Sequence, residues 1–423
     1  MAVSRGGRRR PDVLVVGAGI GGLTLALELH DAGIPCRVYE AVPAIAPVGV
    51  GVNVLPHASA VLDRLGLTGP LTRVAVTTRE SVFYNRFGQL VHREPAGRHA
   101  GYDSAQFSVH RADLHRVLLD AVRERLGPAA VRLGYRCTGA TQDDDGVRVG
   151  FRGVPDDAAR PDERAAVVVG CDGVHSVLRR QLHPDEGEPV YSGVNMWRGV
   201  TRWPPFLTGA SMVRAGWLRT GKLVAYPVRN AVDDAGRQLV NWVAEIETPR
   251  YARRDWNRTG NLDDFLGAFE DWHFDWLDVP ALLRAADLVL EYPMVDQDPV
   301  DRWTLGRTTL LGDAAHPMVP RGSNGAGQAI LDAHALREEL DRTDDVTAAL
   351  RAYEARRLPA TARVVRANRS NPPDAILREV YQRTGDRPFR RIEDVISAAE
   401  LAAISDAYKE VAGYSPEALR AGR

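Results

Sequence analysis

An α/β (α+β) fold is predicted for this chain, in which a domain with a parallel sheet is interleaved with a mostly antiparallel β-sheet domain and followed by C-terminal helices. Three observations predict it. The sequence GAGIGG at residues 17–22 joins a short apolar run to a helical pattern. A second glycine-rich motif, GDAAHP, occurs much later, at residues 312–317. Between them, residues 189–302 contain aromatic-rich alternating segments, which are typical of antiparallel strands.

The first motif has the chemistry of a nucleotide-binding turn. The apolar run at residues 13–16 suits a strand buried on both faces, and the turn after it leads into a helix. Gly17 permits a tight turn, Gly19 lets the backbone approach a pyrophosphate, and Gly22 lets the helix pack close to the strand. Gly21 belongs to the same turn and is counted among the candidate cofactor contacts.

Glu40 supports this interpretation. A second strand over residues 37–40 ends in this acid, about twenty residues beyond the glycines, where a carboxylate can accept hydrogen bonds from the hydroxyls of an adenosine ribose. Glycine-rich turns also occur for purely steric reasons. The combination of strand, turn, helix, strand and terminal acid is more specific than the glycines alone, and it predicts dinucleotide binding in a Rossmann-like domain.

The second motif predicts that the chain returns to its first sheet. Residues 308–311 form a candidate strand, Asp313 follows its end, and a long helix over 326–340 begins after a glycine-containing turn. Asp313 can bond the ribityl hydroxyls of a flavin, and backbone amides near Gly325 and Ala326 can face the flavin pyrimidine edge. The alternative, a simple turn with a helix cap, leaves the conjunction with the first motif unexplained. Two loops that grip one large ligand indicate FAD.

The composition fits a cytoplasmic enzyme. The net charge of -1 gives no general attraction to nucleic acid or to a membrane surface. The three cysteines are scattered and suggest neither a disulfide framework nor a CxxC redox pair. The basic start at residues 5–10 is expected to be a disordered tail, and no stretch has the length of a transmembrane helix. The acidic run at residues 143–145 is expected to be a solvated turn, and no metal site is predicted.

Two polar residues between the motifs have both a structural and a cofactor-binding interpretation. Arg111 lies near the start of an amphipathic helix, where its guanidinium can pair with a flavin pyrophosphate or remain a surface or capping charge. Asp172 follows the apolar strand at residues 166–169, and it can cap the next helix, reach the cofactor, or do both. His175, in the same loop, is assigned no role.

The central region supplies candidate walls for a substrate pocket. Trp197, Tyr226 and Trp242 lie within its predicted strands, and such aromatic residues belong to the core by default. A sheet that covers a flavin would nevertheless need an apolar wall for a flat substrate. Residues 263–275 are predicted to form a helix with a Phe and Trp packing face. The predicted strands are 194–201, 222–228, 239–247 and 288–294.

At this point the chain resembles the single-component, class A flavoprotein aromatic hydroxylases, whose type member acts on 4-hydroxybenzoate. Three ordered motifs carry the resemblance, which extends from residue 13 to about residue 367: GAGIGG at 17–22, CDG at 171–173, and GDAAHPMVPRGSNGAGQAILDA at 312–333. Within this family, the chain looks most similar to the phenazine hydroxylase type of pyocyanin biosynthesis, through residues 196–201, 255–257 and 292–299.

The resemblance implies an FAD-dependent monooxygenase. NADH or NADPH would reduce the flavin, reduced flavin would capture O2 as a C4a-hydroperoxide, and one oxygen atom would pass to a planar aromatic or heteroaromatic substrate. Attack either at a free ring carbon or at a carboxyl-bearing carbon, with loss of carbon dioxide, suits a phenazine- or salicylate-like substrate. Two alternatives stay open: a flavoprotein oxidase or reductase without oxygen insertion, and non-catalytic sequestration of an aromatic antibiotic. The expected state is a monomer or a homodimer.

The resemblance also implies roles for cofactor-binding residues. It places the ADP part of FAD at Gly17, Gly19, Gly22 and Glu40, the pyrophosphate at Arg111, and the ribityl chain at Asp313. It places the isoalloxazine ring beside Pro320, Gly325 and Ala326. It makes residues 48–53, with Gly51 and Val52, the segment along which the flavin swings between an exposed and an enclosed position.

Two arginines are candidate substrate anchors. Arg321, beside Pro320, can hold a substrate carboxylate, and the alternative for it is a solvent-facing loop charge. Arg198, within an aromatic strand, is the second candidate. Pro320, Arg321 and Arg198 are therefore the predicted catalytic-site residues. The predicted substrate contacts are Trp197, Arg198, Tyr226, Trp242, Met294 and Pro317.

The positions of the motifs predict discontinuous domains. An FAD-binding domain is expected at residues 11–80, 106–188 and 303–370, and a substrate-binding sheet domain at 81–105 and 189–302. Residues 371–423 are expected to form a C-terminal extension with helical runs at 374–383 and 393–411. This extension is expected to pack across a domain or against a partner subunit.

Overall fold

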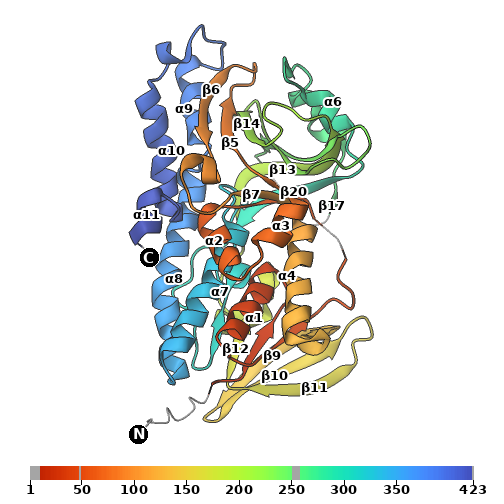
Figure 1. Ribbon diagram of the computed structural model, residues 1–423, viewed down its shortest axis with the longest axis vertical. Helices are drawn as coiled ribbons and strands as arrows, with labels where there is room; N and C mark the ends of the chain where they lie inside the picture. Colours follow the sequence, from red (N-terminus) through yellow and green to blue (C-terminus); the bar gives the residue numbers. More distant parts are fainter. Residues whose placement is uncertain (1–9, 47–48, 250–257, 422–423) are drawn as a thin grey trace.

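The computed structural model describes residues 10–46, 49–249 and 258–421. Its first layer is a five-stranded sheet in the order β21-β12-β1-β2-β8, in which every neighbouring pair is parallel. This sheet lies in the lower half of Figure 1. Its strands are β1 (Val13–Val16), β2 (Cys36–Glu40), β8 (Val131–Leu133), β12 (Val167–Gly170) and β21 (Thr308–Leu310).

The order of this sheet explains why the two glycine-rich motifs meet. β1 and β12 are buried along their whole length, as their apolar, β-branched sequences predict. β21 pairs with β12 although it comes much later in the chain, and Leu311 N donates to Gly170 O at 2.9 Å. The predicted return of the chain to its first sheet is therefore confirmed, as is the mixed α/β fold class.

Helices cover this first sheet. α1 (Ile20–Asp31) packs against both α4 (Arg111–Leu126) and α7 (Gly325–Arg342), and α7 packs in turn against α8 (Val346–Ser370). Gly21 allows the close approach of α1 and α7, because a Cβ there would lie 2.7 Å from Leu311 Cδ2 and 3.2 Å from Ala329 Cβ. The shorter helices are α2 (Pro56–Arg64), α3 (Thr68–Val74) and α5 (Val177–Leu182).

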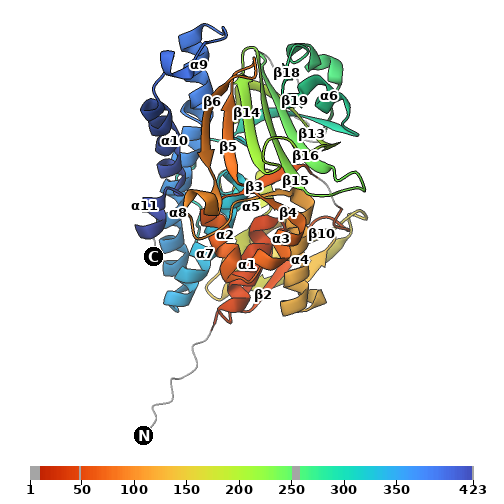
Figure 2. The ribbon, with the colours of Figure 1, turned by 45° about the horizontal axis from the view of Figure 1, so that its top comes forward.

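The second large sheet has eight strands in the order β17-β20-β13-β16-β15-β14-β5-β6 and forms the upper part of the molecule (Figures 1 and 2). Its neighbours pair antiparallel, except that β14 runs parallel to β5. The strands are β5 (Glu80–Tyr84), β6 (Leu90–Pro95), β13 (Val190–Trp203), β14 (Ser211–Trp217), β15 (Gly221–Arg229), β16 (Gln238–Glu247), β17 (Arg258–Thr259) and β20 (Val289–Asp296).

A small sheet in the order β3-β7-β4 connects the two large ones. Gly51 N, on β3, donates to Asn241 Oδ1 on β16 at 2.7 Å. The strands of this sheet are β3 (Gly51–Val54), β4 (Ala75–Thr77) and β7 (Phe107–His110). A separate three-stranded sheet contains β9 (Tyr135–Asp143), β10 (Gly146–Gly153) and β11 (Ala159–Ala165).

Residues 263–275 do not form the predicted helix. Backbone bonds there span three residues rather than four, as in the bond from Phe269 N to Leu266 O. The apolar spacing that suggested a helix instead buries Phe265 and Trp272 in the core of the second sheet. The observed elements are 3-10 turns at Leu262–Asp264 and Leu266–Ala268, the hairpin of β18 (His273–Phe274) and β19 (Leu277–Asp278), and then α6 (Val279–Arg284).

The C-terminal helices pack on the same chain, on the left of Figure 1. α9 (Ala375–Thr384) lies against β14 and β5, α10 (Ala398–Ala412) lies against α8 and α9, and α11 (Pro416–Ala421) follows. The predicted helical start at residue 393 is wrong. Residues 392–394 form a 3-10 turn, and α10 begins only after Ser397, whose side chain makes a capping box with Glu400.

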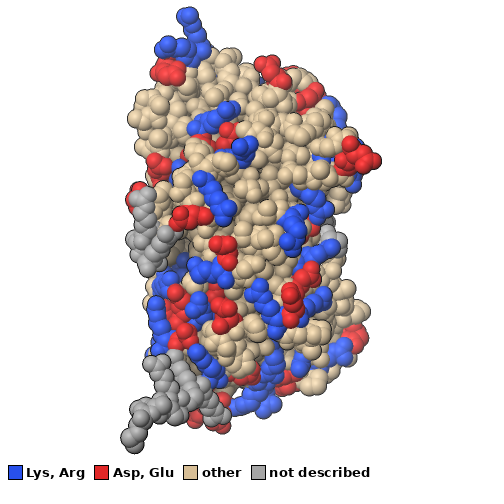
Figure 3. All heavy atoms as spheres, viewed as in Figure 1, with Lys and Arg blue, Asp and Glu red and all other residues tan. Residues whose placement is uncertain are grey.

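Some expectations concern residues outside the described ranges: residues 5–9 of the basic start, Val48, and residues 255–257. Within the described ranges, no helix has both the length and the apolar character needed to cross a membrane. The same ranges contain no group of three or more His, Cys, Asp or Glu side chains arranged to hold a metal ion. On the face shown in Figure 3, charged side chains of both signs are interspersed.

Gly21→Ala is expected to lower the free energy of unfolding by about 1–3 kcal/mol, because the added methyl group overpacks the contact between α1 and α7. Gly267→Ala is the matched control, since a Cβ at this exposed turn residue meets no described atom within 4 Å, and it should be neutral or slightly stabilising. Urea unfolding measures both. Equal stability of the two variants would contradict the close α1–α7 contact.

Candidate active site

The turn after β1 gives its glycines different roles. Gly17 has a φ of +105°, and a Cβ on it would lie 2.3 Å from Cys171 O. A Cβ on Gly22 would lie 2.0 Å from Gly17 O. At Gly19, which precedes α1, a Cβ would meet no atom of the described residues within 4 Å. Gly17 and Gly22 therefore make the turn possible, and Gly19 leaves the N-terminus of α1 open to a ligand.

Gly21 and Glu40 complete this turn in different ways. The missing side chain of Gly21 faces Leu311 and Ala329, which gives this glycine a role in helix packing, and its predicted cofactor contact stays a prediction. Glu40, at the end of β2, accepts a hydrogen bond from Ala18 N at 2.7 Å through Oε2 and one from Val42 N at 3.0 Å through Oε1. Glu40 therefore fixes the backbone beside the open end of α1.

Asp172 lies between the two glycine-rich motifs. Its Oδ2 accepts a hydrogen bond from Val177 N at 2.8 Å, which is the predicted capping contact for α5. Its Oδ1 is buried and has no hydrogen-bond partner among the described residues. Burial also raises the pKa of this carboxyl above its usual value. An unpartnered buried oxygen at this position suits a hydroxyl or amide of a bound ligand.

Asp313 and Arg111 lie at the same edge of the first sheet. Asp313 follows β21 with an exposed side chain, and a Cβ on Gly325 would lie 3.9 Å from its Oδ1. Gly325 and Ala326 are half-buried and begin α7. Arg111 begins α4 with an exposed side chain, and its Cβ lies 3.2 Å from the position of a Cβ on Gly49. Open helix ends and polar groups at the carboxyl edge of a parallel sheet fit a dinucleotide such as FAD.

Asp332 supports the second glycine-rich motif from within α7. It accepts hydrogen bonds from Gly312 N at 3.1 Å and Arg357 Nε at 2.7 Å, and its Oδ2 lies 2.6 Å from His316 Nε2. Burial acts to raise the pKa of this carboxyl, but His316 and Arg357 lower it to about 2. This group was not predicted from the sequence, because Arg357 belongs to the next helix and no local pattern pairs it with Asp332.

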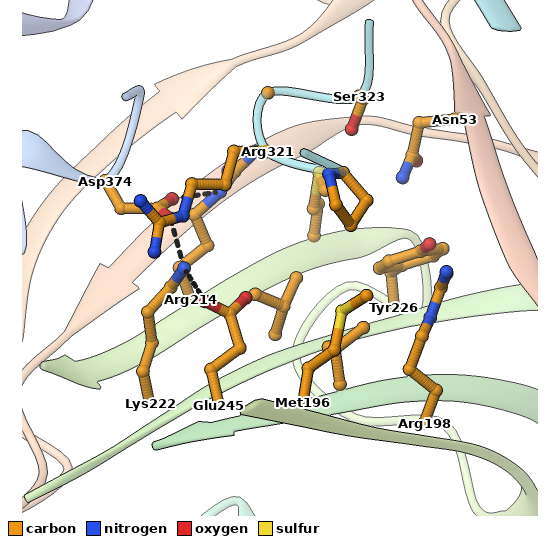
Figure 4. Close-up of a pocket in the computed structure, with 15 residues that line it drawn as sticks. Asn53, Met196, Arg198, Arg214, Lys222, Tyr226, Glu245, Arg321, Ser323 and Asp374 are labelled. Carbon is orange, nitrogen blue, oxygen red and sulfur yellow. Dashed lines mark hydrogen bonds and ion pairs between the residues drawn. The ribbon is translucent and has the colours of Figure 1, made fainter. Parts of the chain in front are cut away.

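A cavity of about 50 Å³ lies between the second large sheet and the loop before α7 (Figure 4). Strands β13 to β16 supply one wall, and residues 320–323 supply the wall opposite. A second hollow of about 310 Å³ adjoins it and shares Met212, Arg214 and Gly322. The two cavities are therefore neighbours.

Strand alternation decides which predicted residues reach the cavity. Arg198 and Tyr226 line it from β13 and β15, and Pro320 lines it from the loop opposite. Met294 packs in the same apolar cluster as Tyr226, beside the cavity, and Pro317 is buried in the loop between β21 and α7. Neither Met294 nor Pro317 is among the described residues that line the cavity.

Trp197 and Trp242 point away from the cavity, which corrects their predicted role as substrate contacts. Trp197 stacks on Phe265, with ring centroids 4.9 Å apart, and Trp242 Nε1 donates to Thr201 Oγ1 at 3.0 Å. Both tryptophans belong to the core on the opposite face of the sheet. Side chains alternate along a strand, so aromatic content alone does not tell which face a residue occupies.

Buried ion pairs gather at one end of the cavity (Figure 4). Lys222 Nζ lies 3.0 Å from Glu245 Oε2 and also pairs with Asp374, and Arg214 Nε lies 3.0 Å from Asp374 Oδ1. Lys222 is 1 % exposed and Asp374 is 3 % exposed. Burial acts to raise the pKa of Asp374, but Lys222 and Arg214 hold it below its usual value. None of these four residues was predicted as a site residue from the sequence.

Arg321 is the fifth charged residue at this end of the cavity. It is 8 % exposed, so the alternative of a solvent-facing loop charge is wrong. Its Nη1 lies 3.5 Å from Asn368 O, and its Nη2 is buried without a hydrogen-bond partner in the described part of the chain. We call these five residues the charge cluster: Arg214, Lys222, Arg321, Glu245 and Asp374. It contains three cations and two anions, and therefore one excess positive charge.

Arg198 joins the second sheet to the segment predicted to carry the flavin. Its Nη2 donates to Gly51 O at 3.0 Å, and its Nε is buried with no hydrogen-bond partner among the described residues. A Cβ on Gly51 would lie 2.8 Å from Tyr226 Cε2, so only glycine fits this close approach of β3 to the sheet. Val52, the next residue, is half-buried.

Asp332→Asn is expected to lower the free energy of unfolding by about 3–5 kcal/mol at neutral pH, because the buried Arg357 loses its counter-charge. The folded pKa is depressed to about 2, so the stability that this carboxylate contributes is present above its ordinary value of 3.8 and is lost as the pH falls toward 2. Chemical unfolding between pH 2 and 7 measures the difference from wild type.

The exposed Asp275→Asn is the control and should change stability by less than about 0.5 kcal/mol at any of these pH values. The difference between wild type and Asp332→Asn should shrink across the acidic window. A difference that stays constant down to pH 2 would contradict the assigned charge of Asp332.

Comparisons with known proteins agree with this geometry. The model of the FAD binding domain family matches residues 10–215 and 292–368. The phenazine 1,6-dicarboxylic acid hydroxylase PhzS of Lysobacter antibioticus is 42 % identical over 404 residues, which is 95 % of this chain and 97 % of that protein. The 6-hydroxynicotinate 3-monooxygenase of Bordetella bronchiseptica is 31 % identical over 374 residues, covering 86 % of this chain and 91 % of that protein.

A solved structure supports the same relationship. The crystal structure of Klebsiella pneumoniae HpxO with FAD and uric acid superposes with a TM-score of 0.71 and 25 % sequence identity, covering 97 % of this chain and 95 % of the other. The FAD family model and the full-length relatives together account for both large sheets. The chain therefore belongs to the FAD binding domain family, among the FAD-dependent aromatic hydroxylases.

Proposed function

We propose that this protein hydroxylates a planar aromatic or heteroaromatic carboxylate, using FAD, O2 and NADH or NADPH. One observation carries the proposal: the charge cluster has one excess positive charge, and Arg321 Nη2 is buried beside the cavity without a hydrogen-bond partner among the described residues. A buried cation without a counter-ion is unfavourable, and a substrate carboxylate would supply the missing charge. A planar guanidinium also suits a carboxylate geometrically.

The relatives support a carboxylated substrate. Their names specify phenazine 1,6-dicarboxylic acid and 6-hydroxynicotinate, which are both heteroaromatic compounds that carry carboxyl groups. The two adjoining cavities would accommodate a molecule longer than a single ring. We propose a phenazine- or salicylate-like carboxylate, with hydroxylation either at a free carbon or, with loss of carbon dioxide, at the carboxyl-bearing carbon.

We assign the cofactor contacts from the polar groups at the edge of the first sheet. The open end of α1 at Gly19 would receive the pyrophosphate with Arg111, Glu40 would lie beside the adenosine ribose, and Asp313 would bond the ribityl chain. The backbone amides of Gly325 and Ala326 would face the flavin ring. When bound, FAD supplies the redox chemistry that activates O2 and transfers one oxygen atom.

The residues of the cavity would bind, orient and shield the substrate. Arg321 would hold the carboxylate, and Arg198 would keep β3 against the sheet through its bond to Gly51 O. Burial raises the pKa of Tyr226, although the charges of Arg198 and Arg214 act to lower it. The phenol therefore stays protonated near neutral pH and can donate a hydrogen bond to a substrate oxygen. Met196 and Val224 would exclude water from the reacting carbon.

We also propose the predicted division into domains and a cytoplasmic location. The pairing of β5 and β6 with the strands of residues 189–302 supports a substrate sheet built from both 81–105 and 189–302. The parallel sheet supports an FAD-binding domain from 11–80, 106–188 and 303–370. The three cysteines are free thiols in this structure, which suits a reducing compartment.

Arg321→Gln is expected to raise the KM for a carboxylated aromatic substrate about 10- to 100-fold, because a charge-assisted bond is lost. Replacing the substrate carboxylate by a carboxamide should weaken binding to the wild type by a similar factor and hardly affect the variant. Steady-state kinetics with both compounds measures this. The exposed Arg366→Gln is the control and should behave like wild type. If wild type and Arg321→Gln discriminate equally between the carboxylate and the carboxamide, Arg321 does not hold the substrate carboxylate.

Gly19→Ala is expected to raise the dissociation constant for FAD at least about tenfold, because the methyl group enters the space that a pyrophosphate needs. The stability of the FAD-free protein should stay unchanged, since the backbone at Gly19, with φ −72°, suits alanine and the methyl group meets no described atom. Fluorescence titration of FAD and thermal unfolding measure the two effects. Unchanged FAD affinity would place the pyrophosphate elsewhere.

A further inference from the structure

The loop between Pro320 and α7 forms one wall of the cavity and carries Arg321, yet little regular structure holds it. Gly322 and Ser323 both have left-handed backbone conformations, with φ of +70° and +59°. Non-glycine residues rarely adopt this conformation without support from their surroundings. The contacts that hold this loop therefore decide where Arg321 lies.

Tyr408 of α10 supplies such contacts. Its ring is buried, at 2 % exposed, and its hydroxyl accepts a hydrogen bond from Asn324 Nδ2 at 2.7 Å and donates one to Asn368 Oδ1 at 2.6 Å. A Cβ on Gly322 would lie 1.8 Å from the same hydroxyl. Burial raises the pKa of Tyr408, so the hydroxyl keeps its proton over the whole working pH range.

The same contacts lead to Arg321 and to the start of α7. Asn368, which bonds Tyr408 through its side chain, accepts from Arg321 Nη1 at 3.5 Å through its backbone carbonyl. Gln328, in the first turn of α7, donates to Ala412 O of α10 at 3.3 Å. Asn324 and Asn368 are 1 % and 0 % exposed, so water cannot replace the hydroxyl without a rearrangement of the loop.

We propose that Tyr408 is a positioning residue that holds the loop of Pro320 and Arg321 against the cavity. The FAD family model ends at residue 368, so this contact comes from a part of the chain that the model does not include. The C-terminal extension thereby contributes to the site as well as to folding. The substrate part of the test below rests on the proposed function, whereas the exchange part does not.

Tyr408→Phe removes the hydroxyl and keeps the ring. In FAD-loaded protein, hydrogen–deuterium exchange of residues 319–326 should increase. With an aromatic carboxylate that wild type hydroxylates, the ratio of hydrogen peroxide to hydroxylated product should rise about tenfold, because small misplacements in a site cost about this much or more. Flavin reduction by NAD(P)H without substrate should stay unchanged. Tyr381→Phe, on α9, is the control and should change neither quantity, since Tyr381 lines neither the cavity nor the second hollow.

Asn324→Ala removes the same bond from the side of the loop, and it should reproduce both effects even where Tyr408→Phe folds poorly. Unchanged exchange and unchanged coupling in the folded variants would overturn the proposal. A fall in melting temperature with intact coupling would also overturn it, since the role of Tyr408 would then be structural only. Failure of wild type to hydroxylate any aromatic carboxylate would instead refute the proposed function, and the exchange result would still decide the role of Tyr408.

Discussion

β21 pairs in parallel with β12, and the position of everything that follows it depends on this pairing. The pairing brings Asp313 to the edge of the sheet where Gly17 approaches Cys171. Asp172 lies at the same edge, and its buried Oδ1 has no hydrogen-bond partner among the described residues. It also fixes α7, whose N-terminus faces that edge and whose preceding loop forms one wall of the cavity. The chain between β12 and β21 can form most of the second large sheet, because only the two ends of this segment must meet the first sheet.

The charge cluster shows how the site and the fold depend on one another. Lys222 and Arg214 are too deeply buried to remain unpaired, and Asp374 from the C-terminal extension pairs with both. Arg321 Nη1 donates a long bond to Asn368 O, and its Nη2 has no hydrogen-bond partner among the described residues, which leaves Arg321 available to an anionic ligand. Asp374 from the extension and Glu245 from β16 together balance two of the three positive charges of the charge cluster, and one positive charge is left over. The proposed affinity for an aromatic carboxylate would follow from this one unbalanced charge.

The sequence predicts the first sheet well because each of its signals is local. An apolar run, a glycine turn and a terminal acid need no knowledge of distant residues, and β1, α1 and β2 match them. Trp197 and Trp242 were wrongly predicted to contact the substrate. Which face of a strand points into the core depends on the neighbouring strands of the sheet, and the sequence of one strand does not show it. The pairing of Lys222 with Asp374 joins distant parts of the chain, so no sequence spacing reveals it. The spacing in residues 263–275 reflects burial of aromatic rings in turns, not a helix.

In the proposed reaction, the bound flavin transfers one atom of O2 to an aromatic carboxylate. The most direct test is mass analysis of products after the FAD-loaded protein reacts with isotopically labelled O2, NADH plus NADPH, and a panel of phenazine and hydroxybenzoate carboxylates. The expected product carries one labelled oxygen atom, with or without loss of the carboxyl group. Two results would contradict it across the panel: formation of labelled hydrogen peroxide alone, or binding of the aromatic compounds without faster NAD(P)H oxidation.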